Sequence, residues 1–202
     1  MDGPVYARPA ISLIAEGLGP FGAALFIGGS AGASGIGLLR QHQITTVLNC
    51  AVNLDINYVQ ADQGTADLRA SGYGDIRYYK IGLIDGEGSP DTMMLGAYYV
   101  LDGALRQTMP KRETYPFPDG GNVLVNCRSG RSSRSLSLVA LFLHKQQPHL
   151  YPSLDDALAV IRERRELRPD EWFETPKPML YAAAQRASEW IDMIEERRQR
   201  NS

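Results

Sequence analysis

The chain is predicted to form an α/β domain, with a central mixed, mostly parallel sheet and helices on both of its faces. Short apolar stretches rich in β-branched residues alternate along the chain with longer stretches of helical periodicity. Hydrophobic residues make up 44% and charged residues 22% of the 202 residues, as in ordinary globular proteins. A chain of this length can bury a substantial core within one domain.

The order of the expected elements follows from apolar periodicity and from the positions of Gly and Pro. Residues 1–23 contain several Gly and Pro residues and are expected to be an irregular lead-in, before a single domain at 24–202. Ser153 is the expected N-cap of the helix that follows it. Strands are expected at 24–27, 44–48, 76–84 and 123–125, helices at 36–41, 92–108, 136–143, 154–166 and 179–202, and loops or irregular connections at 55–74, 110–120 and 169–178.

The stretch 121–144 indicates the chemistry. An apolar strand leads into the loop NCRSGRSSRS (126–135), and a strongly apolar helix follows. Backbone amides of such a loop, at a helix N-terminus, can bind an anion, and the same field favours the thiolate form of a cysteine. Arginine can hold two phosphate oxygens at once with its planar fork. The stretch therefore predicts a phosphate site with Cys127 as nucleophile; the alternative is a buried structural cysteine.

Composition excludes several other classes of function. The formal net charge of −2 argues against bulk electrostatic binding of nucleic acid, and no apolar run approaches the ~20 residues of a membrane span. Only two cysteines occur, which indicates a reducing compartment and a cytoplasmic protein rather than a disulfide scaffold. The three histidines are scattered, so neither a metal site nor another cofactor is expected.

Taken together, these stretches resemble the cysteine-dependent dual-specificity phosphatases. That family has a strand, a Cys, a Gly three positions later, and then Arg-Ser at the start of a helix. Here Cys127, Gly130 and the dipeptide Arg134-Ser135 match in kind. The stretches LFIG (25–28) and ITTVLN (44–49) and the strand end at 81–85 match as well, so the resemblance covers residues 24–167 and implies a phosphatase-like fold.

The chain departs from the family pattern at two positions. The family places its arginine six positions after the cysteine, where this chain has Ser133, and Arg134 comes one position later. A one-residue bulge in the loop that still brings Arg134 to the phosphate is favoured over a malformed pocket. Asn126 stands where the family has a histidine, and an amide cannot become cationic beside the thiolate.

The resemblance implies a role for each matching residue. Cys127 would attack phosphorus, Arg134 would bind the phosphate oxygens, and Ser135 would donate to the sulfur as it departs. Asp85, at the end of a predicted strand, is the expected general acid, and Asp91 on the same loop is the second candidate. The alternative is that Asp85 is an ordinary aspartate of a turn. The other residues expected to bind phosphate are those of the loop itself: Arg128, Ser129, Gly130, Arg131, Ser132 and Ser133.

Two further features resemble one branch of the superfamily, the tumour-suppressor lipid phosphatases. That branch also places basic residues one and four positions after the cysteine, where this chain has Arg128 and Arg131, and this suggests a polyanionic substrate. The equally weighted alternative is that these two side chains point to solvent or pair with acidic residues. Cys50 ends a predicted strand in the context Asn-Cys-Ala, where that branch has a cysteine able to form a reversible disulfide with the nucleophile. A packed structural cysteine is the alternative at this position.

The sequence thus favours a phosphomonoester hydrolase acting through a phosphocysteine on a phosphorylated protein or a small phosphorylated molecule. A catalytically weak pseudophosphatase that binds phosphorylated partners is the first alternative. A phosphoinositide or inositol phosphate phosphatase and a rhodanese-like sulfurtransferase are the others. The oligomeric state is left open.

Overall fold

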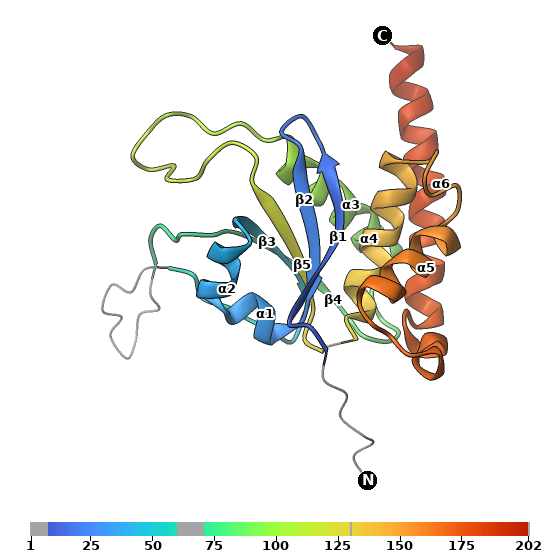
Figure 1. Cartoon of the computed structure of the whole chain (residues 1–202). Coiled ribbons are helices and arrows are strands. Elements are labelled where there is room, and N and C mark those ends of the chain that lie inside the picture. Colours follow the sequence, from blue (N-terminus) through green and yellow to red (C-terminus); the bar gives the residue numbers. More distant parts are fainter. Residues whose placement is uncertain (1–7, 60–70, 130, 202) are drawn as a thin grey trace.

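The computed structural model describes residues 8–59, 71–129 and 131–201. Its centre is a five-stranded sheet in the order β1-β2-β5-β3-β4 (Figure 1). The β1 strand pairs antiparallel with β2, and all other neighbours are parallel. The mixed, mostly parallel sheet expected from the sequence is therefore confirmed. The strands are β1 (Ile11–Leu18), β2 (Ala23–Gly28), β3 (Ile44–Ala51), β4 (Arg77–Leu83) and β5 (Asn122–Asn126).

Helices cover both faces of the sheet, also as expected (Figure 1). The small pair α1 and α2 lies on one face, and α3 to α6 lie on the other. Ser153 caps α5 within a capping box, as predicted. The helices are α1 (Ser30–Ser34), α2 (Ile36–Gln41), α3 (Asp91–Arg106), α4 (Ser133–Gln146), α5 (Leu154–Arg164), the short 3-10 helix η1 (Pro169–Glu174) and α6 (Pro178–Arg200).

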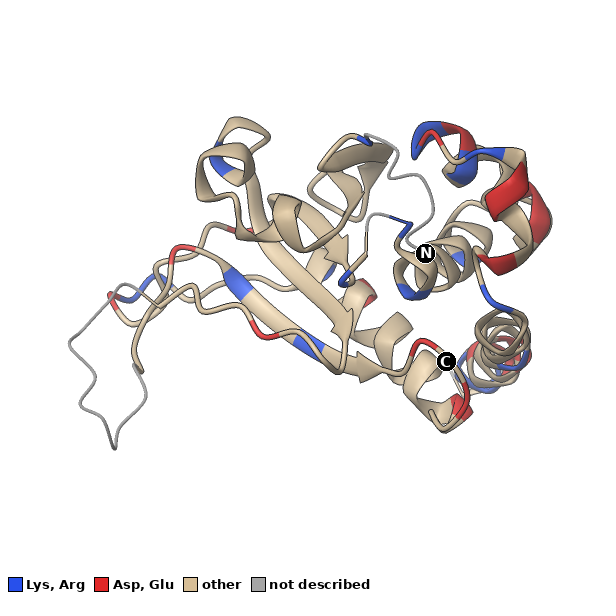
Figure 2. Cartoon of the chain, turned by 90° about the horizontal axis from the view of Figure 1, so that it is seen from below, with Lys and Arg blue, Asp and Glu red and all other residues tan. Residues whose placement is uncertain are grey.

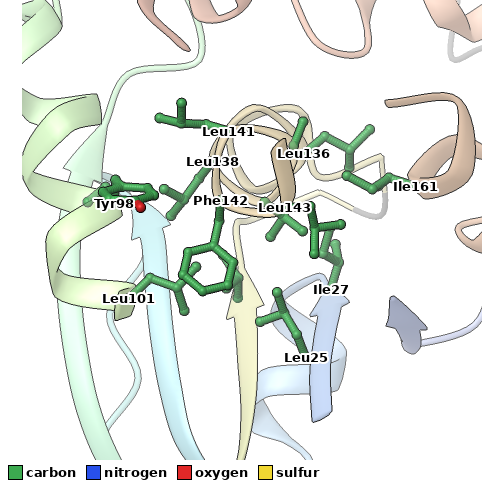
Figure 3. Packing of buried hydrophobic residues seen from close by; sticks show 14 of the residues in the cluster. Leu25, Ile27, Tyr98, Leu101, Leu136, Leu138, Leu141, Phe142, Leu143 and Ile161 are labelled. Atoms are coloured by element: carbon green, nitrogen blue, oxygen red, sulfur yellow. The ribbon is translucent and has the colours of Figure 1, made fainter. Parts of the chain in front are cut away.

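Alternating residues of the central strands build a hydrophobic cluster on each face. In β5, Val123 and Val125 belong to the cluster beneath α3 to α6, whereas Leu124 belongs to the cluster beneath α1 and α2. The larger cluster surrounds α4, whose Phe142 points toward the sheet between α3 and β2 (Figure 3). The helix that follows the cysteine loop is therefore the most deeply buried of the described helices.

Two expectations about irregular segments are wrong. The lead-in expected at 1–23 contains β1, an eight-residue edge strand. Its hydrophobic alternation is broken by irregular register at Ala15 and near Leu18, so the sequence does not show period two. The connection expected to be irregular at 169–178 contains η1, which starts at a proline.

The described residues contain no helix with the length and apolar character needed to cross a bilayer. Within the same residues, no group of three or more His, Cys, Asp or Glu side chains could hold a metal ion. Both acidic and basic residues lie on the helices at the right of Figure 2.

Candidate active site

The cysteine loop lies at the carboxyl end of the central strand β5. Parallel pairing puts Gly28 of β2 and Asn49 of β3 on either side of Asn126, the last residue of β5. Cys127 follows directly, and α4 begins at Ser133. Since the carboxyl ends of parallel strands meet at one edge of the sheet, the loop is surrounded by the turns that follow β2, β3 and β4, which is the usual place for a ligand in such folds.

Ser132 is the structural centre of the loop. Its backbone has a positive φ of 61°, a left-handed conformation that turns the chain into α4. Its buried hydroxyl contacts Gly28 O at 2.9 Å and Ser129 O at 3.0 Å. A further hydrogen bond, from Ser30 N to Arg128 O at 3.3 Å, ties the loop to the start of α1. The loop is thus anchored to the β2 side of the sheet.

Several loop amides remain available for a ligand. The backbone N–H groups of Arg128, Ser129 and Arg131 donate to no acceptor among the described residues. The N-terminus of the 14-residue helix α4 lies at the end of the same loop and adds its positive dipole end. This arrangement is suited to binding an anion. Gly130, also expected to bind phosphate, lies outside the described residues.

Cys127 is almost completely covered. The residue is 1% exposed, and its thiol makes a weak contact with Ser129 O at 3.9 Å. The structure therefore places Cys127 in the loop at the carboxyl end of β5, with almost none of its surface exposed.

Arg134 lies inside the molecule, on the β4 side of the loop. It is 3% exposed, and its Nη1 donates to Leu83 O at 3.0 Å and to Asn53 Oδ1 at 3.4 Å. Its Nε is buried and has no partner among the described residues. One nitrogen of the fork is thus anchored at the end of β4, and another lacks an acceptor that a phosphate oxygen can supply.

Two other polar atoms beside the cysteine loop also lack partners among the described residues. They are Oδ1 of Asn126 and the hydroxyl of Ser135, both buried. Asn126 uses its Nδ2 to donate to Cys127 O at 3.3 Å, so the amide does hold the loop where the family has a histidine. Buried polar groups are normally satisfied, and those left over at one place indicate a site that a polar ligand completes.

The two candidate general acids have different partners. Asp85 is 40% exposed at its side chain and contacts Lys177, whose ammonium lies 2.9 Å from Asp85 O and 3.8 Å from its Oδ2. Asp91 starts α3 and makes a bidentate ion pair with Arg186 of α6. That hydrogen bonding lowers the pKa of Asp91. Asp91 is therefore committed to a structural contact, and Asp85 is the better candidate for proton transfer.

Cys50 is fully buried near the end of β3, and its thiol is free, as is that of Cys127. Burial raises its pKa strongly, and the negative charge of an ionised Cys127 nearby raises it further. The charge of Arg134 and the hydroxyl of Ser135 also lie near Cys50, and both lower its pKa. The structure thus brings Cys50, Cys127, Arg134 and Ser135 into one cluster.

The two extra arginines of the loop differ in their surroundings. Arg131 pairs with Glu174 of η1 at 3.3 Å, and both side chains are about half exposed. Arg128 instead lines a cavity of about 230 Å³ together with Arg8 and Arg165. The remaining lining residues are Pro9, Ala10, Gly29, Ser30 and Ala31, none of them acidic.

Sequence reasoning missed Arg165 and Lys177. Arg165 is completely buried; its Nη1 donates to Pro9 O at 3.0 Å and Ser12 Oγ at 2.9 Å, and its charge interacts with that of Cys127. Lys177 lies between two prolines in the connection before α6. Neither position carries a signal in the sequence, because a helix-end arginine and a connecting lysine are usually solvated.

Comparisons with known proteins identify the fold. No protein-family model and no curated protein matches the chain. Among solved structures, human DUSP28 is 18% identical with a TM-score of 0.60, over 95% of this chain and 99% of that one. The Yvh1 phosphatase domain from Chaetomium thermophilum is 22% identical with a TM-score of 0.60, over 91% of this chain and 96% of that domain.

A third match is the human tyrosine phosphatase-like serine/threonine/tyrosine-interacting protein. It is 20% identical with a TM-score of 0.54, over 84% of this chain and 93% of that one. At these identities the comparisons show the fold. The chain has the dual-specificity phosphatase fold, as its sequence led us to expect.

Proposed function

We propose that this chain, with its dual-specificity phosphatase fold, hydrolyses phosphomonoesters through a phosphocysteine intermediate. The observation that carries the proposal is the cysteine loop between β5 and α4, whose amides at Arg128, Ser129 and Arg131 donate to no acceptor among the described residues. The unpartnered Nε of Arg134 supports it, because a bound phosphate would supply its acceptor.

Hydrolysis would proceed in two steps. The Cys127 thiolate attacks phosphorus, the sulfur–phosphorus bond forms, and the ester bond breaks as Asp85 gives its proton to the leaving oxygen. Asp85, now a carboxylate, then takes a proton from a water molecule that attacks phosphorus, which releases phosphate and restores the thiolate. Arg134 and the loop amides hold the equatorial oxygens, and Ser135 stabilises the departing sulfur.

The decisive experiment measures hydrolysis of an aryl phosphate by the unmodified chain, Cys127→Ser and Asp85→Ala. We expect no turnover by Cys127→Ser and a fall in kcat of about 10²- to 10⁴-fold for Asp85→Ala. The reaction needs only side chains and water, so activity should survive a metal chelator. A reducing compartment such as the cytoplasm would keep the thiol active.

A pseudophosphatase is the alternative favoured by the 1% exposure of Cys127. In that case the unmodified chain would show no turnover above Cys127→Ser, while vanadate or phosphate would still bind. A thiosulfate-dependent persulfide on Cys127 would instead indicate a rhodanese-like sulfurtransferase. The three outcomes are therefore separable with one set of proteins.

The cavity at Arg128 favours a polyanionic substrate, an inositol phosphate or a phosphoinositide, as a second candidate for the substrate class. Burial lowers the pKa of Arg165, and the charge of the nearby Arg8 lowers it further, to about 10. A second phosphate of the substrate would relieve this repulsion between two guanidinium groups. A phosphorylated protein would need only the cysteine loop.

Arg8 offers a matched pair of variants for this question, because it forms an ion pair with Glu171. Arg8→Gln removes the cation and the ion pair, whereas Glu171→Gln removes the ion pair alone. For an inositol polyphosphate we expect KM to rise about tenfold in Arg8→Gln and to stay level or fall in Glu171→Gln. Equal changes in the two variants, or an equal change with a simple aryl phosphate, would exclude a second phosphate in this cavity.

A further inference from the structure

The connection between α5 and α6 touches the candidate site at three points. Glu174 pairs with Arg131 of the cysteine loop at 3.3 Å. The backbone N–H of Lys177 donates to Ser133 Oγ, on the first residue of α4, at 3.1 Å. The side chain of Lys177 reaches in the other direction, and its ammonium donates to Asp85 O at 2.9 Å. One residue therefore bridges the helix that follows the nucleophile and the loop that carries the candidate acid.

Strand pairing alone does not hold these two parts together. Cys127 follows β5 and Asp85 follows β4, and β3 lies between those strands in the sheet. The loop after β4 also contains Gly86 and Gly88, and glycines widen the range of backbone conformations that a loop can adopt. Its far end is fixed by the ion pair between Asp91 and Arg186 of α6. The near end is held by the bond from Arg134 to Leu83 O at 3.0 Å and by the bond from Ile84 N to Ser89 Oγ at 2.9 Å. At Asp85 itself the contact is made by Lys177.

We propose that Lys177 is a positioning residue that sets the place of Asp85 relative to the cysteine loop; this inference rests on the proposed phosphatase function. Its bond is to the main-chain carbonyl of Asp85, whereas the carboxylate oxygen lies at 3.8 Å, beyond hydrogen-bond length. The loop is held by its backbone, and the carboxyl group remains able to carry a proton to a leaving oxygen. Holding an acid in place before the substrate arrives lowers the entropic part of the barrier.

The contact is also suited to the partly open surface where it lies. The Lys177 side chain is 34% exposed and that of Asp85 is 40% exposed, so the ion pair by itself would be weak in water. Because the main chain of Lys177 is fixed by its bond to Ser133, its side chain can hold Asp85 in place.

The test compares Lys177→Met and Lys177→Arg with the control Lys145→Met. Lys145 joins α4 to Asp192 of α6 at 2.8 Å, so its loss removes a lysine contact of α6 that does not involve the loop carrying Asp85. The substrates are phenyl phosphate, whose leaving group needs an acid, and dinitrophenyl phosphate, whose leaving group does not. For Lys177→Met we expect kcat with phenyl phosphate to fall about tenfold or more, and kcat with dinitrophenyl phosphate to change less than about twofold.

Lys177→Arg should restore most of the lost activity, and Lys145→Met should not alter the ratio between the two substrates. Combining Lys177→Met with Asp85→Ala should add no further loss on phenyl phosphate, because both changes would remove the same proton transfer. Equal losses on both substrates, additive losses in the double variant, or a gain of activity in Lys177→Met would overturn the proposal.

Amide hydrogen exchange provides a readout that needs no catalysis. Exchange at the amides of residues 84–89 should be faster in Lys177→Met than in the unmodified chain, and unchanged in Lys145→Met. If the unmodified chain lacks phosphatase activity, the proposed function fails while this measurement still decides whether Lys177 holds the loop. Unchanged exchange in Lys177→Met would refute the positioning role in either case.

Discussion

Arg134→Lys tests whether the arginine that comes one position late in the loop binds the substrate phosphate. Lysine keeps the positive charge but loses the planar fork. In the structure one fork nitrogen is anchored on Leu83 O, and Nε has no partner among the described residues. Lysine has a single terminal donor, so it can keep the bond to Leu83 O or donate from the position of Nε, but not both. Losing one donor to a developing phosphorane costs about 10²- to 10³-fold in kcat, or about 2.7–4 kcal/mol of transition-state stabilisation.

The same variant should lose less than about 1 kcal/mol of unfolding free energy, because the ammonium at the end of the lysine side chain can still donate to Leu83 O, whereas no donor remains at the position of Nε. The assay is steady-state hydrolysis of an aryl phosphate, with urea unfolding measured in parallel. Arg131→Lys is the comparison, since Arg131 is about half exposed and pairs with Glu174. Such a pair contributes about 0–1 kcal/mol, so we expect a change in kcat below about threefold. Retention of activity by Arg134→Lys, or an equal loss in Arg131→Lys, would refute the assignment.

Three other predictions concern separate parts of the molecule. Ser153→Ala removes the capping box of α5 and should cost about 1 kcal/mol, a fall in Tm of about 2–4 °C; an unchanged melting curve would contradict this. The ion pair with Arg186 lowers the pKa of Asp91, so its stabilising effect is complete above the usual aspartate pKa of about 3.9 and is lost as pH falls through the lowered value; an NMR titration should show the Asp91 pKa rising in Arg186→Met. Mild peroxide should convert Cys127 to a sulfenic acid that condenses with the Cys50 thiol to a disulfide and water, and recovery of free Cys50 after this treatment would exclude the crosslink.

The sequence predicts the sheet well where strands are buried on both sides. Apolar runs such as 44–48 and 123–125 are long enough and β-branched enough to be read directly, and both are central strands. It fails at β1, an edge strand whose irregular register breaks the alternation that a half-buried strand normally shows. The position of β1 depends on the register shifts in its pairing with β2, and local composition does not reveal these shifts.

The candidate site was predictable as a loop but not as a set of contacts. The strand, Cys127 and the apolar helix are adjacent in the chain, so the sequence displays them together. The choice between Asp85 and Asp91 depends on Arg186, which lies 95 positions after Asp91 and gives no local clue. Lys177 and Arg165 likewise reach the site from the segments that follow α5, far along the chain from Cys127. Long-range pairing between ionic side chains is not encoded in any short window of sequence.

The long loop between α3 and β5, residues 107–121, has a practical consequence. It extends away from the sheet and leads into the amino end of β5, whereas Cys127 follows the carboxyl end of the same strand (Figure 1). Its tip carries exposed side chains such as Tyr115. An epitope or a fluorescent label inserted between 111 and 117 would therefore be separated from the candidate site by the length of a strand, and a protease cut there would leave both ends of the break on folded elements. The loop is therefore a suitable place to label or immobilise the molecule while its activity is measured.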